Sequence, residues 1–560
     1  MPERSAEELA KKQREISIAE FFEKNRHLLG FDNPRRALLT AIKEGVDNAL
    51  DACEEGRILP EVNIELIQLT ETRFRIIMED NGPGIIPKQI PKIFAKLLYG
   101  SKFHKLSATR GQQGIGISAT VLYSQLTTGK PTTILSKTAA NKKAHLFKLK
   151  IDTVTNNPDI IEDKETDWEG KEKGTRIELE LEGAYIKGRQ SVDEYIKETA
   201  IVNPHCTLIY TNPEAQQIIF PRATEELPPE AKEIKPHPYG VELGRLIKLL
   251  EITETKTLQQ FLTTEFVRVG PGTAKEICQN SSLLPNTKPE EVSREMAEKL
   301  YEGIQKTKII APPIDCISPI GSELLERGLR KEINAEFYCS ITRPPMVYRG
   351  NPFIIEVGIA YGGEQEAETT IRVMRFANRV PLLYQQGACA ITAAIQQNSW
   401  RSYGLNQSKD SLPVGPCTVA VHISSVWVPF TSESKEALAH YPEIIKEIKL
   451  ALQEAGRKLA SFINKKKRLN DESKKRGYIE KYIPHVAEAL KEIINFDENK
   501  QKEIEQKLGE ILEKTRGELE DLSIDNPDYD PELAEIGKEE ETEENDEEEQ
   551  KPKKKNKREE

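Results

Sequence analysis

The clearest pattern of apolar and polar positions lies between Asn33 and Gly56. Asn33 is a good helix N-cap, and Pro34 suits a first helical residue, whose N–H has no partner inside the helix. Apolar residues then recur at helical spacing and predict a stripe packed on a core, formed by Leu38, Ile42, Val46, Ala49, Leu50 and Cys53. Another face carries Glu44, Asn48 and Asp51. That face is either simply solvated, or its carboxylate and carboxamide provide a general base and a metal ligand.

Two strands are predicted after this helix, over 62–69 and 74–80, the first with strong alternation. The second runs into Asp80-Asn81-Gly82-Pro83-Gly84. This pentapeptide is typical of a turn, because glycine permits a positive φ and proline fixes its own φ. An aspartate at the end of a buried strand can also accept a hydrogen bond from an exocyclic amine such as adenine N6.

A glycine-rich stretch follows. The polar segment from Tyr99 to Arg110 has the character of a mobile lid, and Gly111, Gly114 and Gly116 then lead into a helix predicted over 117–126. Closely spaced glycines before a helix N-terminus can bring backbone N–H groups to an anion. They are equally common as a plain entry into a helix. The stretch is neither a P-loop nor a strand-bound Rossmann loop.

Residues 131–182 alternate short β-rich runs with polar turns, and Gly174-Thr175 opens the last strand. Residues 230–308 become helical, with a glycine-bounded turn at 269–272 before a helix expected to start at Thr273. Such a turn is common where a backbone meets a DNA phosphate, although this region can also be a structural spacer.

Strands return over about 311–430, and a long helix is predicted from about Lys435 to Lys467. We expect the helix to end in the polar run KKKRLNDESKKRG, followed by further helices to about 522. The last residues contain no apolar side chains and carry blocks of each charge, so a disordered tail is predicted.

Composition narrows the class of protein. A chain of 560 residues predicts three or four domains. Its net charge of -11 says little about nucleic acid, since much of it comes from the tail. No apolar run approaches the ~20 residues of a membrane span, and the charged N-terminus has no signal core. Seven scattered cysteines favour reduced thiols in the cytosol over disulfides or a zinc site.

Taken in order, the ExxxN helix, the DxGxG strand end, the lid with its glycines and the GT strand start form one set. It resembles the nucleotide site of the ATPase superfamily of gyrase, heat-shock chaperones, histidine kinases and mismatch-repair proteins. The stretches LLYGSKFHKLSATRGQQGIGISATVLYSQ, KPHPYGVE and SITRPPMVYRGNPFIIEVGIAYGG further resemble the B-subunit family of the type IIB topoisomerases, topoisomerase VI. This likeness covers roughly residues 15–465. Asp47 stands where that family usually has glutamate.

The resemblance implies an α+β multidomain fold: an α/β-sandwich (Bergerat) ATPase domain with an N-terminal arm over 1–228, then a helix–two-turns–helix domain over 229–310. The implied fold continues with a transducer domain with a long helix over 311–467, a helical region over 468–525 and the disordered tail over 526–560. The arm reaches a second subunit or packs on its own domain.

The resemblance also implies roles for individual residues. Glu44 would be the general base for water attack on the γ-phosphate, and Asn48 a Mg²⁺ ligand. Asp80 would accept from adenine, with Gly84 and Thr175 beside it. Lys435, at the expected start of the long helix, would contact the γ-phosphate and couple it to the transducer. The implied ATP-binding set is Asn48, Asp80, Gly84, Ser101, Lys102, Arg110, Gly111, Gln112, Gln113, Gly114, Ile115, Gly116, Thr175 and Lys435.

As a member of that family, the chain would bind and hydrolyse ATP with Mg²⁺, dimerise on ATP and clamp double-stranded DNA. Strand passage would need the separate cleaving A subunit in an A2B2 heterotetramer, because no tyrosine here lies beside an acidic metal-binding cluster. The expected location is the cytoplasm, at the nucleoid and away from membranes.

Three other classes share parts of this pattern. A histidine kinase would need a phosphoacceptor histidine helix, and none of the eight histidines has that setting. A chaperone or mismatch-repair clamp would lack the helical insertion before the transducer. A DNA-binding module without enzymatic activity would show a concentrated basic face.

Overall fold

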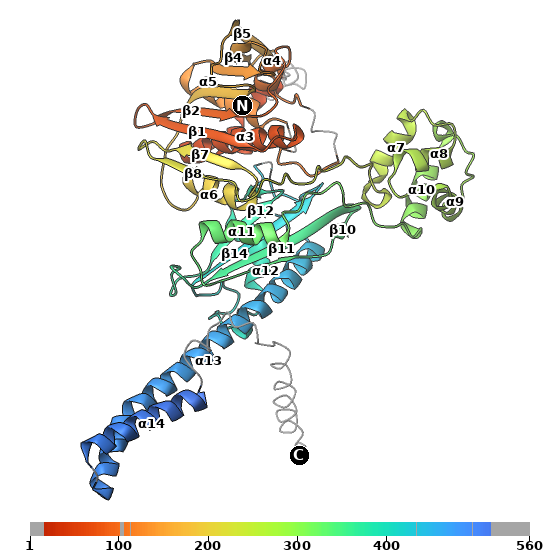
Figure 1. Ribbon diagram of the computed structural model, residues 1–560. Coiled ribbons are helices and arrows are strands. Elements are labelled where there is room, and N and C mark those ends of the chain that lie inside the picture. The colour runs from red at the N-terminus through yellow and green to blue at the C-terminus, as the bar shows by residue number, and fades with distance from the viewer. Residues whose placement is uncertain (1–15, 101–105, 112–113, 433, 496, 517–560) are drawn as a thin grey trace, which may run out of the picture. The chain divides into compact units, whose positions relative to one another are not determined.

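The structure is a computed structural model that describes residues 16–100, 106–111, 114–432, 434–495 and 497–516 (Figure 1). The chain divides into two compact units, residues 1–459 and 460–560, and the boundary falls inside one long helix. Within the described residues, no helix combines the length and apolarity that crossing a bilayer requires. The predicted multidomain α+β fold is confirmed.

The first module is an eight-stranded sheet in the order β5-β4-β3-β6-β2-β1-β7-β8, antiparallel except where β1 pairs with β7. Its strands are β1 (Glu61–Gln68), β2 (Arg73–Asp80), β3 (Thr132–Lys137), β4 (Ala144–Asp152), β5 (Asn157–Thr166), β6 (Gly174–Glu182), β7 (Thr207–Thr211) and β8 (Gln217–Phe220). Burial alternates along β1 and β3, as expected for a sheet with one covered face. β5 was not predicted, because its side chains are mostly exposed and polar.

The helices of this module are α2 (Ile18–Lys24), α3 (Pro34–Glu55), α4 (Ile90–Ala95), α5 (Gly116–Thr128) and α6 (Val192–Val202). The α3 prediction is confirmed: the Asn33 side chain accepts from the Arg36 N–H, and all members of the predicted apolar stripe are buried. α2 packs on its own domain, where Ala19 is buried in the core that α3 and the sheet share. Residues 1–15 of the predicted arm lie outside the described residues.

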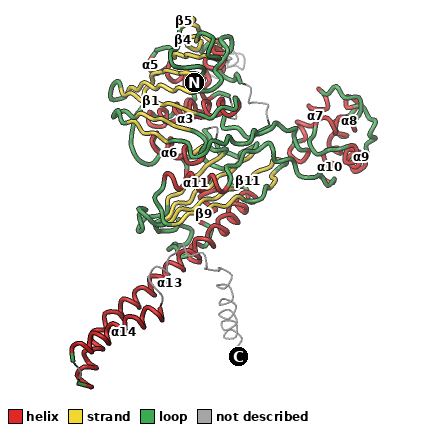
Figure 2. Tube along the Cα trace, viewed as in Figure 1, coloured by secondary structure: helices red, strands yellow, loops and turns green. Residues whose placement is uncertain are grey.

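The second module is helical (Figure 2), as predicted. It contains α7 (Leu243–Ile252), α8 (Leu258–Glu265), α9 (Pro271–Asn280) and α10 (Arg294–Lys306), which share a core of their own. α9 begins two residues before the expected Thr273, with Gly270 as its N-cap, since Pro271 suits a first helical position.

The third module is a six-stranded sheet with helices α11 (Ser322–Glu332) and α12 (Ala390–Gln396). Its strands are β9 (Phe337–Thr342), β10 (Met346–Tyr348), β11 (Asn351–Tyr361), β12 (Arg372–Ala377), β13 (Val380–Pro381) and β14 (Cys417–Ser425). Nearly every residue of β11 and β14 is buried, so neither strand shows the alternation of buried and exposed positions seen in β1 and β3. The seven cysteines of the chain are all buried and unbridged.

Two predictions about the long helix are wrong. α13 (Pro442–Ile494) begins at Pro442 and not at Lys435, because residues 430–438 form a small hairpin in which the Thr431 N–H donates to the Ala437 carbonyl. It also continues through the polar run where we expected it to end, since Lys, Arg and Glu are good helix formers on an exposed surface. A further helix, α14 (Glu498–Arg516), follows, and the predicted tail lies outside the described residues.

A glycine sets the distance between the first and third modules. In α11, a Cβ atom at Gly328 would lie 2.1 Å from the Ile201 carbonyl oxygen of α6. We therefore expect Gly328→Ala to lower the free energy of unfolding by about 1–3 kcal/mol, the usual cost of overpacking. Gly244→Ala in α7 is the matched control: a Cβ there meets nothing within 4 Å, so its effect should stay within about 1 kcal/mol. Equal effects in chemical denaturation would contradict this close packing.

Candidate functional site

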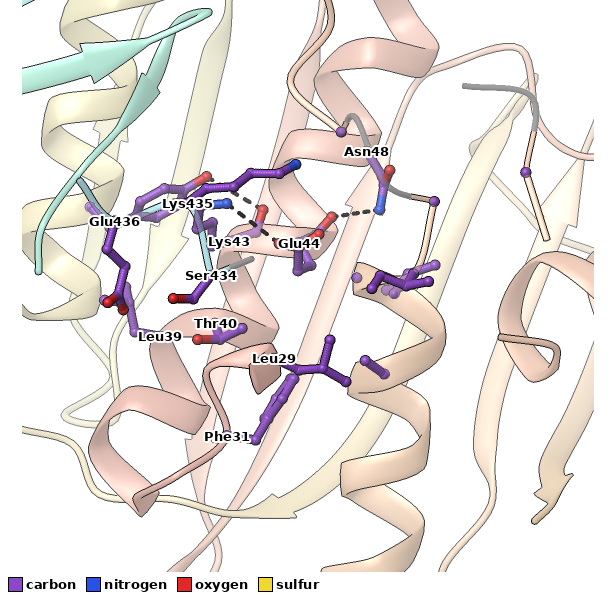
Figure 3. Close-up of a pocket in the computed structure, with 18 of the residues that line it drawn as sticks. Leu29, Phe31, Leu39, Thr40, Lys43, Glu44, Asn48, Ser434, Lys435 and Glu436 are labelled. Carbon is purple, nitrogen blue, oxygen red and sulfur yellow. Dashed lines mark hydrogen bonds and ion pairs between the residues drawn. The ribbon is translucent and has the colours of Figure 1, made fainter. Parts of the chain in front are cut away.

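A cavity of about 610 Å³ lies between the first and third modules (Figure 3). Its walls come from α3, from the glycine stretch before α5 and from two loops of the third module. Its lining includes Lys43, Glu44, Asn48, Gly111, Gly114, Ile115, Gly116, Tyr195, Lys435 and Glu436. The sequence predicted most of this set from segments nearly 400 residues apart.

The Glu44 carboxylate lies against the start of α5. A Cβ atom at Gly116 would be 1.7 Å from Oε2 of Glu44, so a side chain at position 116 would displace this carboxylate. Asn48, one turn further along α3, donates from Nδ2 to the Glu44 backbone carbonyl at 2.7 Å. That bond uses the nitrogen of the amide group and leaves Oδ1 as the atom that can ligate a cation.

Lys43, which the sequence analysis did not select, lines the cavity and balances charge in its wall. Its Nζ is 3.2 Å from Oδ2 of Asp47 and 3.4 Å from Oε1 of Glu44. The Tyr195 hydroxyl donates to the other oxygen of Asp47 at 2.9 Å. Burial would lower the pKa of Lys43, but the charges of Asp47 and Glu44 raise it above its ordinary value, so the lysine stays protonated. The i, i+4 spacing of Lys43 and Asp47 in the sequence was the signal that could have indicated this ion pair.

The predicted adenine acceptor, Asp80, is buried at the end of β2. Two backbone N–H groups donate to its Oδ1: that of Gly82 at 2.8 Å and that of Thr175 at 3.2 Å. Burial raises the pKa of Asp80 to about 6. Ser136, which the sequence analysis missed, bonds Thr175 through its hydroxyl and accepts from the Ile85 N–H, joining the Gly84 turn to β6.

Gly84 is required where it stands. Its φ is +71°, and a Cβ atom would lie 2.2 Å from the Lys137 carbonyl oxygen. Asp80, Gly84 and Thr175 therefore form one compact group, although none of them lines the 610 Å³ cavity.

The glycine stretch meets the cavity through Gly111, Gly114, Ile115 and Gly116, four members of the ATP-binding set that the resemblance implies. Gly114 has a φ of +58°, which favours glycine. The remaining members of the predicted set, Ser101, Lys102, Gln112 and Gln113, lie outside the described residues.

The Arg110 side chain does not line this cavity. Its buried guanidinium pairs with Asp51 at 2.8 Å and with Glu54 at 2.6 Å, and it also donates to Asn203. His205 bonds the same Glu54 carboxylate. The predicted nucleotide contact of the Arg110 side chain is thus not supported, because α3 uses its charge internally. For the same reason Asp51 does not serve with Glu44 and Asn48.

Lys435 lies in the hairpin before α13, with a φ of +53° that is uncommon for a side chain of this size. Its half-buried ammonium group lines the cavity and donates to the Arg110 backbone carbonyl at 3.3 Å. Burial lowers its pKa, against the opposing effect of Glu44. The next residue, Glu436, pairs with Arg36 of α3, and Gln385 donates to the same carboxylate at 2.8 Å. The sequence analysis missed both of these anchors.

Sequence comparisons agree with this arrangement. Residues 33–183 match the family described as histidine kinase-, DNA gyrase B-, and HSP90-like ATPase, and residues 312–475 match the family described as topoisomerase VI B subunit, transducer. Fold and site therefore define an ATP-binding domain of this superfamily followed by a transducer.

Two relatives narrow the family further. The B subunit of type 2 DNA topoisomerase 6 from Methanosarcina barkeri is 52% identical over 493 residues, covering 88% of this chain and 79% of that protein. The B subunit from Archaeoglobus fulgidus is 47% identical over 484 residues, covering 86% and 80%. The chain belongs to the family of type 2 DNA topoisomerase 6 B subunits, which confirms the predicted resemblance.

The buried Asp80 predicts a pH-dependent stability. Because its pKa is raised from 3.8 to about 6, the folded state keeps a proton that the unfolded state loses between these values. The native state is therefore progressively destabilised as pH rises from about 4 to 6, and the full cost remains above 6. Asp80→Asn keeps the Oδ1 acceptor without the charge. We expect the Tm of this variant, relative to the parent, to rise over that interval and then level off.

Calorimetry from pH 4.5 to 8 measures this trend. Asp159→Asn on β5 is the control, because an exposed carboxylate carries no cost of burial. A Tm difference for Asp80→Asn that does not change with pH would contradict a buried charge at this position.

Proposed function

We propose that this chain is the ATP-hydrolysing B subunit of a type IIB DNA topoisomerase, which closes around a DNA duplex as an ATP-bound dimer. The observation that carries the proposal is the composition of the cavity: the helix with Glu44 and Asn48 forms one wall, and Lys435 of the transducer reaches into the same space. A nucleotide bound here would contact both modules at once.

Glu44 acts as the general base. Its carboxylate lines the cavity beside the first residue of α5, where an attacking water would be oriented toward the γ-phosphate. The ammonium group of Lys43 and the carboxylate of Asp47 behind it hold the local charge in balance, so that Glu44 is kept in one place without being neutralised.

Mg²⁺ fits the donor set next to this base. It prefers oxygen ligands and keeps several waters and phosphate oxygens, so that one neutral protein oxygen suffices. Asn48 supplies that oxygen through Oδ1, and the bound cation would neutralise charge that develops on the phosphates.

The remaining nucleotide contacts follow the predicted set. Asp80 accepts from the adenine amine through Oδ2, since Oδ1 already accepts from two backbone amides. Gly84 and Thr175 keep this carboxylate in place, and backbone N–H groups of residues 111–116 hold the phosphates near the start of α5. Ser101, Lys102, Gln112 and Gln113 belong to the same proposed binding segment.

Lys435 couples the γ-phosphate to the transducer. In the described structure its ammonium group has a carbonyl partner, and a phosphate oxygen would be a stronger one because it carries charge. ATP and ADP would therefore hold the hairpin with different strength, and a ligand must discriminate between two positions in this way to drive a switch.

The proposed partners are a second copy of this chain, double-stranded DNA and a separate DNA-cleaving A subunit in an A2B2 assembly, acting in the cytoplasm at the nucleoid. Exposed Tyr478, Tyr482 and Val486 recur every four residues along α13, which supports a protein contact on that face. The domain boundaries at 228, 310, 467 and 525 remain part of this proposal.

Replacement of the base tests the chemistry. Glu44→Gln removes the charge and keeps the shape, so we expect ATP turnover to fall by about a hundredfold or more, while a non-hydrolysable analogue with Mg²⁺ still binds. Glu55→Gln, an exposed position on the same helix, should hydrolyse ATP at the parental rate. Steady-state hydrolysis measures the rate of ATP turnover, and equilibrium binding measures the affinity for the analogue. Parental turnover by Glu44→Gln would exclude Glu44 as the base.

The clamp is tested by the solution mass of the chain, 63.4 kDa as a monomer, with and without the analogue and Mg²⁺. We expect the mass to double only with the nucleotide. A chain that binds the analogue and stays monomeric would remove dimer closure as its own property. Relaxation of supercoiled DNA should need the A subunit, and strand passage by this chain alone would contradict the proposal.

A further inference from the structure

The residues just before the glycine stretch form hydrogen bonds with several distant segments of the first unit. In the 106–110 segment, the carbonyl of Leu106 accepts from the Ile234 N–H at 3.2 Å, and the Ala108 N–H donates to the Cys316 carbonyl at 2.8 Å. These two partners lie on the chain segments that lead into and out of the helical module. The segment is thus held between both connections of that module.

Its last two residues contact the transducer through their carbonyl groups. The Thr109 carbonyl accepts from Nδ2 of Asn378 at 3.3 Å, and the Arg110 carbonyl accepts from Lys435. Because Gly111 follows directly, the position of this backbone determines where the glycine stretch begins.

The turn that carries Asn378 is itself anchored in the transducer sheet. Asn378 and Arg379 connect β12 to β13 with positive φ angles of 46° and 63°. The Asn378 side chain exchanges two hydrogen bonds with the backbone of Ser425, both at 2.9 Å. The Arg379 N–H donates to Nε2 of the fully buried His422, whose Nδ1 bonds Glu356 at 2.8 Å. The turn therefore moves only with the β11–β14 core.

Asn203 joins this turn to the Arg110 side chain. It is completely buried, its Oδ1 accepts from the Arg110 guanidinium, and its Nδ2 donates to the Arg379 carbonyl at 3.2 Å. The contacts form a closed ring that runs from Arg110 through Asn203 to Arg379, along the chain to Asn378 and back through Thr109. Asp51 and Glu54 hold Arg110 on the other side, on the helix that carries Glu44.

We propose that Asn203 and Asn378 are positioning residues for ATP turnover: they hold the Thr109–Arg110 backbone, and with it the glycine stretch and the acceptor of Lys435, in register with the transducer sheet. Neither residue lines the 610 Å³ cavity. The proposal rests on the proposed function and adds to it a second connection between nucleotide and transducer, separate from the Lys435 side chain.

The buried position of the ring makes this connection stiff. Hydrogen bonds in a low-dielectric interior are strong, and a donor or acceptor left without its partner there has no water to replace it. A shift of the glycine stretch therefore either carries the β12–β13 turn along or leaves buried polar groups without partners.

Two variants interrupt the ring at different bonds. Asn203→Asp keeps the acceptor for Arg110 and removes the Nδ2 donor, and with it both the bond to the Arg379 carbonyl and a 2.9 Å bond to the Thr199 carbonyl of α6. Asn378→Gly suits the positive φ of the turn and removes the bond to Thr109 together with the two bonds to Ser425. Asn212→Asp is the control for the first, being a buried asparagine in the β7–β8 turn. Asn156→Gly is the control for the second, because it also has a positive φ and exchanges two bonds with one residue, Leu97.

Hydrogen exchange of the full-length chain, with and without the non-hydrolysable analogue and Mg²⁺, measures the connection. In the parent we expect the analogue to change exchange in residues 106–111 and in β12–β14. In both ring variants the change in β12–β14 should be lost, with analogue affinity within about threefold of the parent, kcat for ATP reduced tenfold or more and KM little altered. The controls should respond as the parent does.

A parental response of β12–β14 together with a parental kcat in a folded ring variant would overturn the proposal. Thermal unfolding establishes that each variant is folded, and either variant alone is sufficient for the test, because each opens the ring. A parent chain that fails to bind the analogue would instead contradict the proposed function, so the two failures are distinguishable.

Discussion

The close approach of α3 to its neighbours is the constraint on which the rest of the site depends. At Gly45 a Cβ atom would lie 2.2 Å from the Met78 side chain of β2, and at Gly116 it would lie 1.7 Å from the Glu44 carboxylate. A Cβ atom at either position would displace the neighbouring side chain, so glycine lets α3 lie directly on the sheet and lets α5 start directly beside Glu44. The proposed base, the proposed metal ligand and the proposed phosphate-binding backbone are therefore placed by packing before any ligand arrives.

The same helix uses its charged residues for two purposes. Glu44 and Asn48 face the cavity, whereas Asp51 and Glu54 hold the buried Arg110. Burial alone would raise the pKa of Glu54, but Arg110 and His205 lower it below its ordinary value, so the pair stays ionised. A buried charge without a partner is costly, which makes this internal pairing a condition for bringing the segment before the glycine stretch against α3.

Local sequence signals predicted the parts that depend on local chemistry. The Asn33 cap, the apolar stripe of α3 and the DxGxG turn are set by nearby residues, and the structure has them where expected. The signals for the nucleotide site were individually weak and became specific only through their order along the chain. The family resemblance then supplied the roles, and Lys435 could be selected only in this way.

What could not be predicted depends on contacts distant in sequence. The predicted start of the long helix at Lys435 is wrong, because a hairpin that pairs Phe430 with Leu438 uses the backbone that a longer helix would need. Arg110 was assigned to the nucleotide because no periodicity reveals that Asp51, Glu54 and Asn203 surround it. Ser136 lies on β3, where buried and less buried positions alternate, and this pattern does not predict the hydrogen bonds that its hydroxyl makes.

The proposed coupling through the hairpin that carries Lys435 must also act in the reverse direction, from the transducer to the nucleotide. If nucleotide at the cavity biases the position of the transducer, then by reciprocity any partner that fixes the transducer must change nucleotide affinity by the same factor. Occupancy of the cavity would thus report on what is bound far along the chain. Seen in this way, the ATP site is a sensor of assembly as well as the source of its free energy.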